Sequence, residues 1–136
     1  MRTETRVRAR ALQMLYAWEM QGGPPIQRVT MSVMRWNPRQ IACGEAAEAL
    51  ATAVVDRIAD LDRQIGEAAD NWRLDRIGAV ERNILRIGLH ELQESETPAR
   101  VVISEAVRLA HWFAGSKAPA FVNGVLDSLA RVLGRL

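Results

Sequence analysis

The sequence predicts an all-α protein with about seven helices in a compact bundle. Apolar residues recur at the three- and four-residue spacing of amphipathic helices along most of the 136 residues. No stretch combines apolar-polar alternation with many β-branched side chains, so strands are not expected. Prolines and glycines are few and lie between the apolar runs, where one helix can end and the next begin. Residues 1–136 are therefore expected to form a single domain.

The first helix is expected to end at the GGPP sequence of residues 22–25. A second apolar stripe, which includes Leu12, Tyr16 and Met20, runs beside its main apolar face. Two stripes predict a helix that is buried between neighbours. The main apolar face contains Val7, Ala11, Met14, Leu15 and Trp18.

The narrow polar arc of the first helix holds four residues, which we call the arginine strip: Arg2, Arg6, Arg10 and Gln13. Arg8 lies to its side, and both Glu4 and Glu19 fall outside it. Guanidinium groups suit phosphate, so the strip is either an anion-binding surface or the solvated face that any surface helix needs.

Capping residues, prolines and glycines predict the remaining helix boundaries. Asparagine, threonine, aspartate and serine can cap a helix start, proline is favoured just after the cap, and glycine can end a helix. Such signals lie at Asn37 with Pro38, Asp60, the break at 72–75, Thr97 with Pro98, Gly115 and Ser116.

The helix around residues 77–93 has a broad apolar arc, with Glu81 and Glu91 within or beside it. A carboxylate in this position is expected to pair with an arginine of another helix; the alternative is a carboxylate used for chemistry. The polar strip of this helix consists of Arg82, Arg86 and His90.

The next helix places Glu105, Arg108 and Trp112 opposite its apolar face. An aromatic ring beside an arginine there favours stacking on a base or on a partner, although single exposed apolar residues are also common.

The last helix contains FVNGVLD, residues 121–127, in which Asn-Gly would ordinarily predict a turn. The surrounding apolar spacing is helical. Gly124 and Ser128 are therefore interpreted as a notch that lets a neighbouring backbone approach. Asp127 and Arg131 are spaced for an ion pair within the helix.

Composition limits the function classes. Lys117 is the only lysine among 18 basic residues, and the remaining 17 are arginines, although the net charge is only +2. This bias suits phosphate binding but can also reflect genome composition. The single cysteine, Cys43, excludes an internal disulfide and fits a reducing compartment. No targeting or membrane segment is recognisable, so a cytoplasmic location is expected.

Catalytic and metal-binding patterns are not recognisable in the sequence. The two histidines, His90 and His111, lack metal-ligand spacing, and no glycine-rich phosphate loop is present. Nothing near Cys43 would activate it as a nucleophile. We therefore expect a protein that is not an enzyme and that needs no metal or cofactor.

Four segments resemble the NusB family of bacterial transcription antitermination factors in order and spacing: RARALQMLYAWEM, VERNILRIGLHEL, VVISEAVRLA and FVNGVLD. The resemblance covers the first helix and nearly all of residues 72–133, whereas residues 22–45 match poorly. It implies an all-α fold of two packed helical bundles. It also implies binding to the boxA element of nascent ribosomal RNA together with NusE, a small-subunit ribosomal protein, in a complex that joins RNA polymerase and suppresses termination.

The resemblance also implies particular contacts. The family's arginine-rich segment and the loop before FVNGVLD face RNA, and a family glutamate lies near the surface shared with NusE. Relatives often carry arginine where this chain has Glu4 and Thr5, asparagine at Ser104, and a lysine-containing pair at 111–112. The partner contacts predicted are Glu81 and Trp112. With the arginine strip, the RNA contacts predicted are Arg2, Arg6, Arg8, Arg10, Gln13, Tyr16, Lys117 and Phe121.

Two other functions stay open. One is a NusB-like domain related to rRNA cytosine methyltransferases, whose catalytic part follows in a longer chain; the end at 134–136 favours the stand-alone factor. The other is a helical scaffold that binds only proteins. Self-association as a homodimer is also left open.

Overall fold

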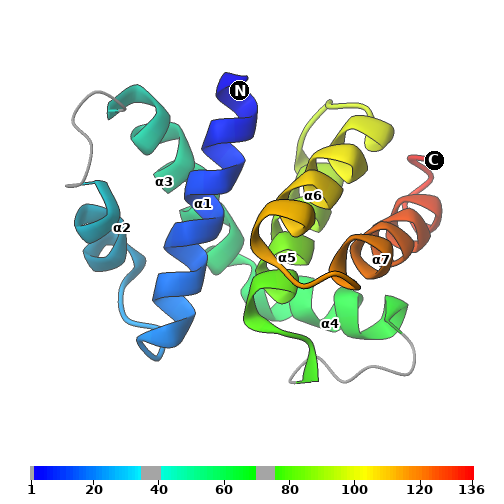
Figure 1. Cartoon of the computed structure of the whole chain (residues 1–136), viewed down its shortest axis with the longest axis horizontal. Coiled ribbons are helices and arrows are strands. Elements are labelled where there is room, and N and C mark those ends of the chain that lie inside the picture. Colours follow the sequence, from blue (N-terminus) through cyan, green and yellow to red (C-terminus); the bar gives the residue numbers. More distant parts are fainter. Residues whose placement is uncertain (1, 35–40, 70–75) are drawn as a thin grey trace. The chain divides into compact units, whose positions relative to one another are not determined.

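The computed structural model describes residues 2–34, 41–69 and 76–136. Their regular elements are all helices, which confirms the predicted all-α class and the helix number (Figure 1). The chain divides into two compact units, Met1–Asp56 and Arg57–Leu136. The helices are α1 (Thr3–Met20), α2 (Ile26–Met34), α3 (Ile41–Asp56), α4 (Ile58–Ala68), α5 (Ala79–Glu94), α6 (Ala99–Phe113) and α7 (Ala118–Val132).

In the first unit, α1 packs against both α2 and α3. Two small side chains of α3, Ala47 and Ala51, are fully buried and allow α1 and α3 to approach closely. The predicted end of α1 is confirmed: Gly22 and Gly23 adopt positive φ values of 84° and 76° after the helix. The Trp18 indole donates a hydrogen bond to the carbonyl of Pro24 at 2.8 Å, which fixes this turn.

The predicted burial of α1 on two apolar stripes is wrong. Leu12 is buried, but Tyr16 and Met20 are 43% and 55% exposed. A helix packed on one side needs only one apolar face, and α1 leaves its other side to water.

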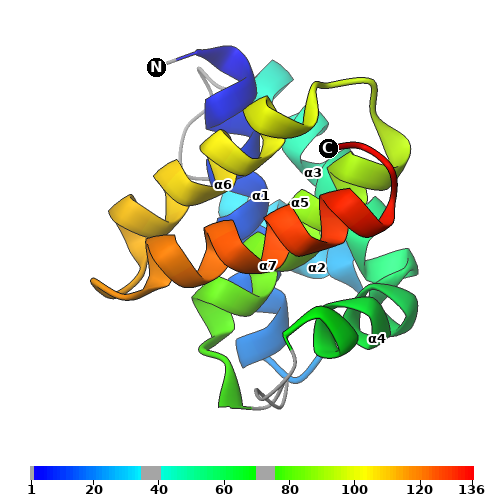
Figure 2. The same ribbon diagram turned by 90° about the vertical axis from the view of Figure 1, so that its right-hand side faces the viewer.

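In the second unit, α5 is the central helix and packs against α4, α6 and α7. Its seven successive residues from Asn83 to Leu89 are all buried. Helices α6 and α7 run side by side in opposite directions and cover α5 (Figure 2). Arg135, beyond α7, donates hydrogen bonds to the carbonyls of Leu92, Ser95 and Thr97 and so holds the turn between α5 and α6.

The close approach of two helices occurs at Gly88 of α5. A Cβ atom on Gly88 would lie 2.8 Å from Cδ1 of Leu126, which is a fully buried residue of α7. The predicted notch at Gly124 is wrong: none of the described atoms lies within 4 Å of a Cβ placed there. Gly124 is exposed because the helix buries its other side, on which Val125 and Leu126 lie.

Arg86 is not part of an exposed polar strip but forms an ion pair that joins α5 to α4. It is buried, and its Nε and Nη2 donate to the two carboxylate oxygens of Asp62 on α4 at 2.7 and 2.8 Å. Its Nη1 donates to Oδ1 of Asn83 at 2.9 Å. A bidentate pair of this kind satisfies the guanidinium and compensates for its loss of water.

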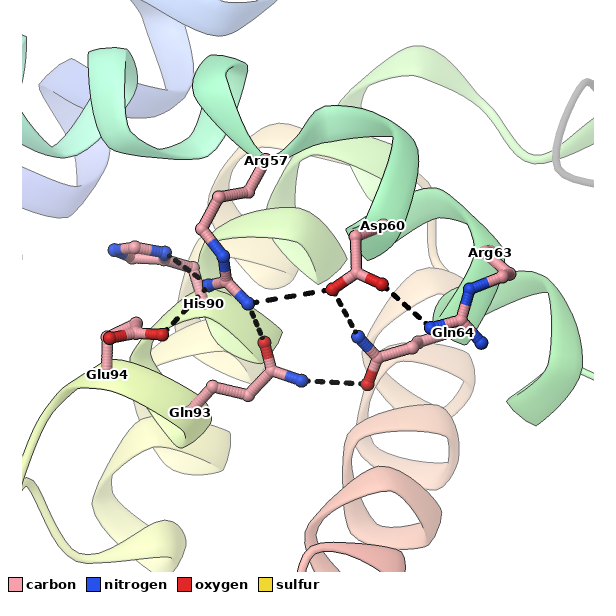
Figure 3. Close-up of polar contacts among 7 residues, drawn as sticks. All are labelled: Arg57, Asp60, Arg63, Gln64, His90, Gln93 and Glu94. Atoms are coloured by element: carbon pink, nitrogen blue, oxygen red, sulfur yellow. Dashed lines mark hydrogen bonds and ion pairs between the residues drawn. The ribbon is translucent and has the colours of Figure 1, made fainter.

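A polar network next to this pair joins the start of α4 to α5 (Figure 3). Arg57 donates to Nδ1 of His90 at 3.0 Å and to Gln93, and it lies 3.5 Å from the carboxylate of Glu94. Because a guanidinium can only donate, Nδ1 of His90 must accept. That nitrogen therefore carries no proton, and the imidazole is neutral. Burial and the Arg57 charge lower the pKa of His90.

The helix starts differ from the predicted caps. The first residue of α4 is Ile58, so Asp60 lies in the first turn, where its carboxylate pairs with Arg63 at 2.7 Å. Pro98 and Lys117 occupy the N-cap positions of α6 and α7, in place of Thr97 and Ser116. Helix α6 ends at Phe113, two residues before Gly115. The predicted boundaries at Asn37 with Pro38 and at 72–75 lie outside the described residues.

No helix within the described ranges is both long enough and apolar enough to cross a lipid bilayer. The predicted ion pair between Asp127 and Arg131 is confirmed at 2.9 Å.

Candidate nucleic-acid interface

The arginine strip lies on the solvent-exposed side of α1. Arg2, Arg6 and Gln13 are exposed, and Arg10 is half-buried with its Nη1 donating to Oε1 of Gln13 at 3.2 Å. Exposed Tyr16 follows Gln13 by one helical turn and adds an aromatic ring to the same side. The strip therefore offers guanidinium and amide donors beside a flat ring, which suits phosphates and bases.

The start of α1 adds to this positive character. Arg2 is its N-cap residue, and its side chain makes no capping hydrogen bond. The backbone N–H groups of the first turn form the positive end of the helix dipole. Glu4 is the acidic residue of the first turn and partly offsets the field.

Arg8 has a different environment from the strip. Only 7% of its surface is exposed, and the neighbouring Thr5 is buried as well. Arg8 thus presents little surface to a ligand, and its part in RNA binding stays a prediction.

A pocket of about 310 Å³ in the second unit brings together three of the predicted site residues, Glu81, Lys117 and Phe121. We call it the Lys117 pocket. Its other lining residues are Arg76, Ile77, Gly78, Gly115 and Ala118.

The Lys117 pocket has the features of an anion site with an aromatic wall. The ammonium group of Lys117 and the guanidinium group of Arg76 are exposed cations, and the ring of Phe121 is half-buried. The N-cap residues of α5 and α7, Gly78 and Lys117, both line the pocket, and neither helix has a side-chain cap. The positive ends of two helix dipoles therefore lie at this pocket and favour a phosphate or carboxylate, although at the start of α7 the N–H of Ala118 already donates to the carbonyl of Gly115 at 3.0 Å.

Glu81 is the carboxylate of this pocket. It lies in the first turn of α5 and packs so closely on Gly78 that a Cβ atom there would overlap its carboxylate. Arg82 donates from Nη1 to the carbonyl of Ile77 and thereby holds the segment that precedes α5. Glu81 can accept hydrogen bonds from bases or from a protein partner, but it repels phosphate.

Trp112 lies near the end of α6 and is 46% exposed. The guanidinium carbon of Arg108 is 6.0 Å from the centre of its ring. Glu105, which the sequence placed on the same polar face, is buried instead and lies 3.9 Å from Arg108.

The sequence did not single out Arg76, Ile77 or Gly78 as site residues. The available signal was an arginine that comes just before the start of a helix carrying Glu81. Only the fold shows that this start lies beside the start of α7. Within the described part of the chain, no three metal-ligating side chains come together.

The described residues form an all-α fold that carries cationic surfaces at the arginine strip and at the Lys117 pocket. The sequence model of the NusB family matches residues 5–131. The chain is 41% identical to the transcription antitermination protein NusB of Sorangium cellulosum, over 95% of this chain and 92% of that protein. The chain belongs to the NusB family.

Solved structures agree with this assignment. The solution structure of NusB from Aquifex aeolicus has a TM-score of 0.83 and 34% identity, with 96% of this chain and 89% of that chain covered. A crystal structure of the antitermination factors NusB and NusE in complex with dsRNA has a TM-score of 0.83 and 32% identity, covering 97% of this chain and 98% of that chain.

Proposed function

We propose that this chain is a transcription antitermination factor that binds the boxA element of nascent rRNA together with NusE. The observation that carries the proposal is the similarity, over nearly the whole chain, to a NusB seen with NusE and dsRNA. The Lys117 pocket and the arginine strip supply surfaces of the required chemistry on this chain. Residues 1–136 act as one RNA- and protein-binding domain in this proposal.

RNA binding begins with phosphates. Arg2, Arg6 and Arg10 attract the RNA backbone in a salt-dependent way, with Gln13 and Arg8 as further polar contacts. Tyr16 on α1 contributes stacking on an unpaired base, which adds preference to the phosphate contacts.

The Lys117 pocket provides the second set of contacts. Lys117 binds a phosphate at the start of α7, and Phe121 packs against a base or ribose. Glu81 selects against a second phosphate in the pocket and is available to a base amino group or to NusE.

NusE acts by extending the surface offered to RNA. Each protein then raises the affinity of the other for RNA, and this coupling is reciprocal. The complex joins RNA polymerase and promotes processive rRNA transcription. The chain works by binding and is not an enzyme, and a function on nascent transcripts places it in the cytoplasm.

RNA binding is tested by fluorescence anisotropy of labelled boxA RNA, with and without the cognate NusE, at two salt concentrations. We expect tighter binding with NusE and weaker binding to a scrambled RNA. Binding of NusE without any RNA binding would contradict the proposal and leave a protein-binding scaffold.

The arginine strip is tested by replacing Arg6 and Arg10 with glutamate. We expect weaker binding with unchanged circular dichroism, and a salt slope shallower by about 0.7 for each phosphate that is no longer neutralised. Arg28→Glu is the matched control for Arg6→Glu, because Arg28 is an exposed arginine of α2 in the same unit. Equal effects of these two single variants would show only a general charge effect.

A further inference from the structure

One face of α6 carries a row of four exposed residues at four-residue spacing: Arg100, Ser104, Arg108 and Trp112. Residues four apart are neighbours on a helix surface, so the row is continuous. It contains two cations, a hydroxyl and an aromatic ring, and no carboxylate. The nearby Glu105 is buried, and its carboxylate reaches Arg108 only at 3.9 Å.

The end of this row is an aromatic platform. The rings of Trp112 and Phe113 meet edge to face, with centres 6.3 Å apart and planes at 82°, and both residues are more than 40% exposed. The guanidinium of Arg108 lies 6.0 Å from the Trp112 ring centre, within the range of a cation–π contact. The neighbouring ring and the cation restrict the indole while leaving nearly half of Trp112 open to a ligand.

The platform lies close along the chain to the Lys117 pocket. Gly115 lines the pocket and follows Trp112 by only three residues, so their Cα atoms are at most about 11 Å apart. A short stretch of single-stranded RNA with its phosphate at Lys117 can therefore reach the indole.

We propose that Trp112 is a base-stacking position that extends the RNA site beyond the Lys117 pocket along α6. This inference rests on the proposed RNA-binding function. RNA is favoured over a protein partner because the ring is flanked by cations, since Arg108 is beside it and Lys117 follows in the loop. An apolar protein surface would take these cations out of water with only the Glu105 carboxylate, 3.9 Å from Arg108, to compensate them. RNA supplies a base for the ring and phosphates for the cations.

The test compares Trp112→Ala and Trp112→Tyr with the wild-type chain, using boxA RNA in the presence of NusE. Loss of one stacked base predicts about 5- to 140-fold weaker RNA binding for Trp112→Ala. Trp112→Tyr retains a π-face and should recover most of the affinity. Val132→Ala is the control, because Val132 is 82% exposed at the far end of α7 and should leave affinity unchanged.

A second readout locates the base directly. Photo-crosslinking with 5-bromouridine-substituted RNA should modify the tryptic peptide of residues 109–117, with fragmentation assigning the link to Trp112. Trimming the RNA by single nucleotides should reach a length at which wild type and Trp112→Ala bind equally.

The outcomes separate this inference from the proposed function. Wild-type binding with an unaffected Trp112→Ala variant overturns the stacking position alone. A variant that loses NusE affinity but keeps RNA affinity in the absence of NusE shows a protein contact and also overturns it. Absence of RNA binding by the wild-type chain with NusE overturns both.

Discussion

Gly88→Ala tests whether α5 and α7 are packed as closely as the structure shows. The added Cβ atom would lie 2.8 Å from Cδ1 and 3.0 Å from Cδ2 of Leu126. Leu126 is fully buried and cannot move toward solvent without repacking its neighbours. Overpacking of this kind costs about 1–3 kcal/mol.

Alanine is also a better helix former than glycine, by about 1 kcal/mol. The net effect of Gly88→Ala is therefore a loss of about 0–2 kcal/mol in the free energy of unfolding. Gly124→Ala is the matched control, since it makes the same change on α7 with no described atom within 4 Å. It should stabilise by about 0.5–1 kcal/mol. The difference between the two variants, about 1–3 kcal/mol, isolates the packing effect.

Urea unfolding followed by circular dichroism measures both variants, with equal slopes as the check that only stability has changed. Introducing Gly88→Ala into a Leu126→Ala background should reverse its sign, because the new methyl group then fills part of a cavity. Equal stabilisation by Gly88→Ala and Gly124→Ala would refute the close approach.

The remaining predictions concern polar groups of the second unit. Asp62→Ala leaves Arg86 buried without its carboxylate and should lower the free energy of unfolding by about 2–4 kcal/mol. Asp127→Ala breaks an exposed ion pair and should lower the free energy of unfolding by less than about 1 kcal/mol. The same urea assay measures both variants. Burial and the Arg57 charge lower the pKa of His90 in the folded state from its ordinary value of 6.5. As the pH falls through 6.5, His90 is therefore protonated in the unfolded chain before it is protonated in the folded chain, and the folded state loses stability. His90→Gln should remove that part of the pH dependence in thermal unfolding; an identical pH profile would contradict the assignment.

The helical class could be predicted because amphipathic spacing is a local property of the chain. Caps were harder to predict. Asp60 can cap a helix in isolation, yet α4 begins at Ile58, directly after Arg57, whose side chain donates to His90 and Gln93 of α5. Such long-range contacts are not visible in local sequence.

The spacing of polar and apolar residues in the sequence also did not show which polar residues are buried. Arg86 shares a four-residue spacing with Arg82 and His90, which are only half-buried, and Arg86 is buried because it pairs with Asp62 on α4. Gly88 and Gly124 both lie in helical runs, and the sequence alone does not show which one faces a neighbouring helix.

For the site, the predictions were partly local and partly borrowed from the family. The exposed side of α1 followed from spacing, and the structure leaves Arg2, Arg6 and Gln13 exposed there. Grouping Lys117 with Glu81 came from the resemblance, and the pocket that joins them also contains Arg76, which neither approach indicated.

In the proposed function, this chain acts with NusE to suppress termination through boxA. Transcription through a terminator placed downstream of boxA, in a cognate extract depleted of this protein, measures that activity. We expect readthrough to rise when the wild-type chain is restored with NusE, and not on a template with a scrambled boxA. Equal readthrough with and without the chain, or equal restoration on the scrambled template, would contradict the account.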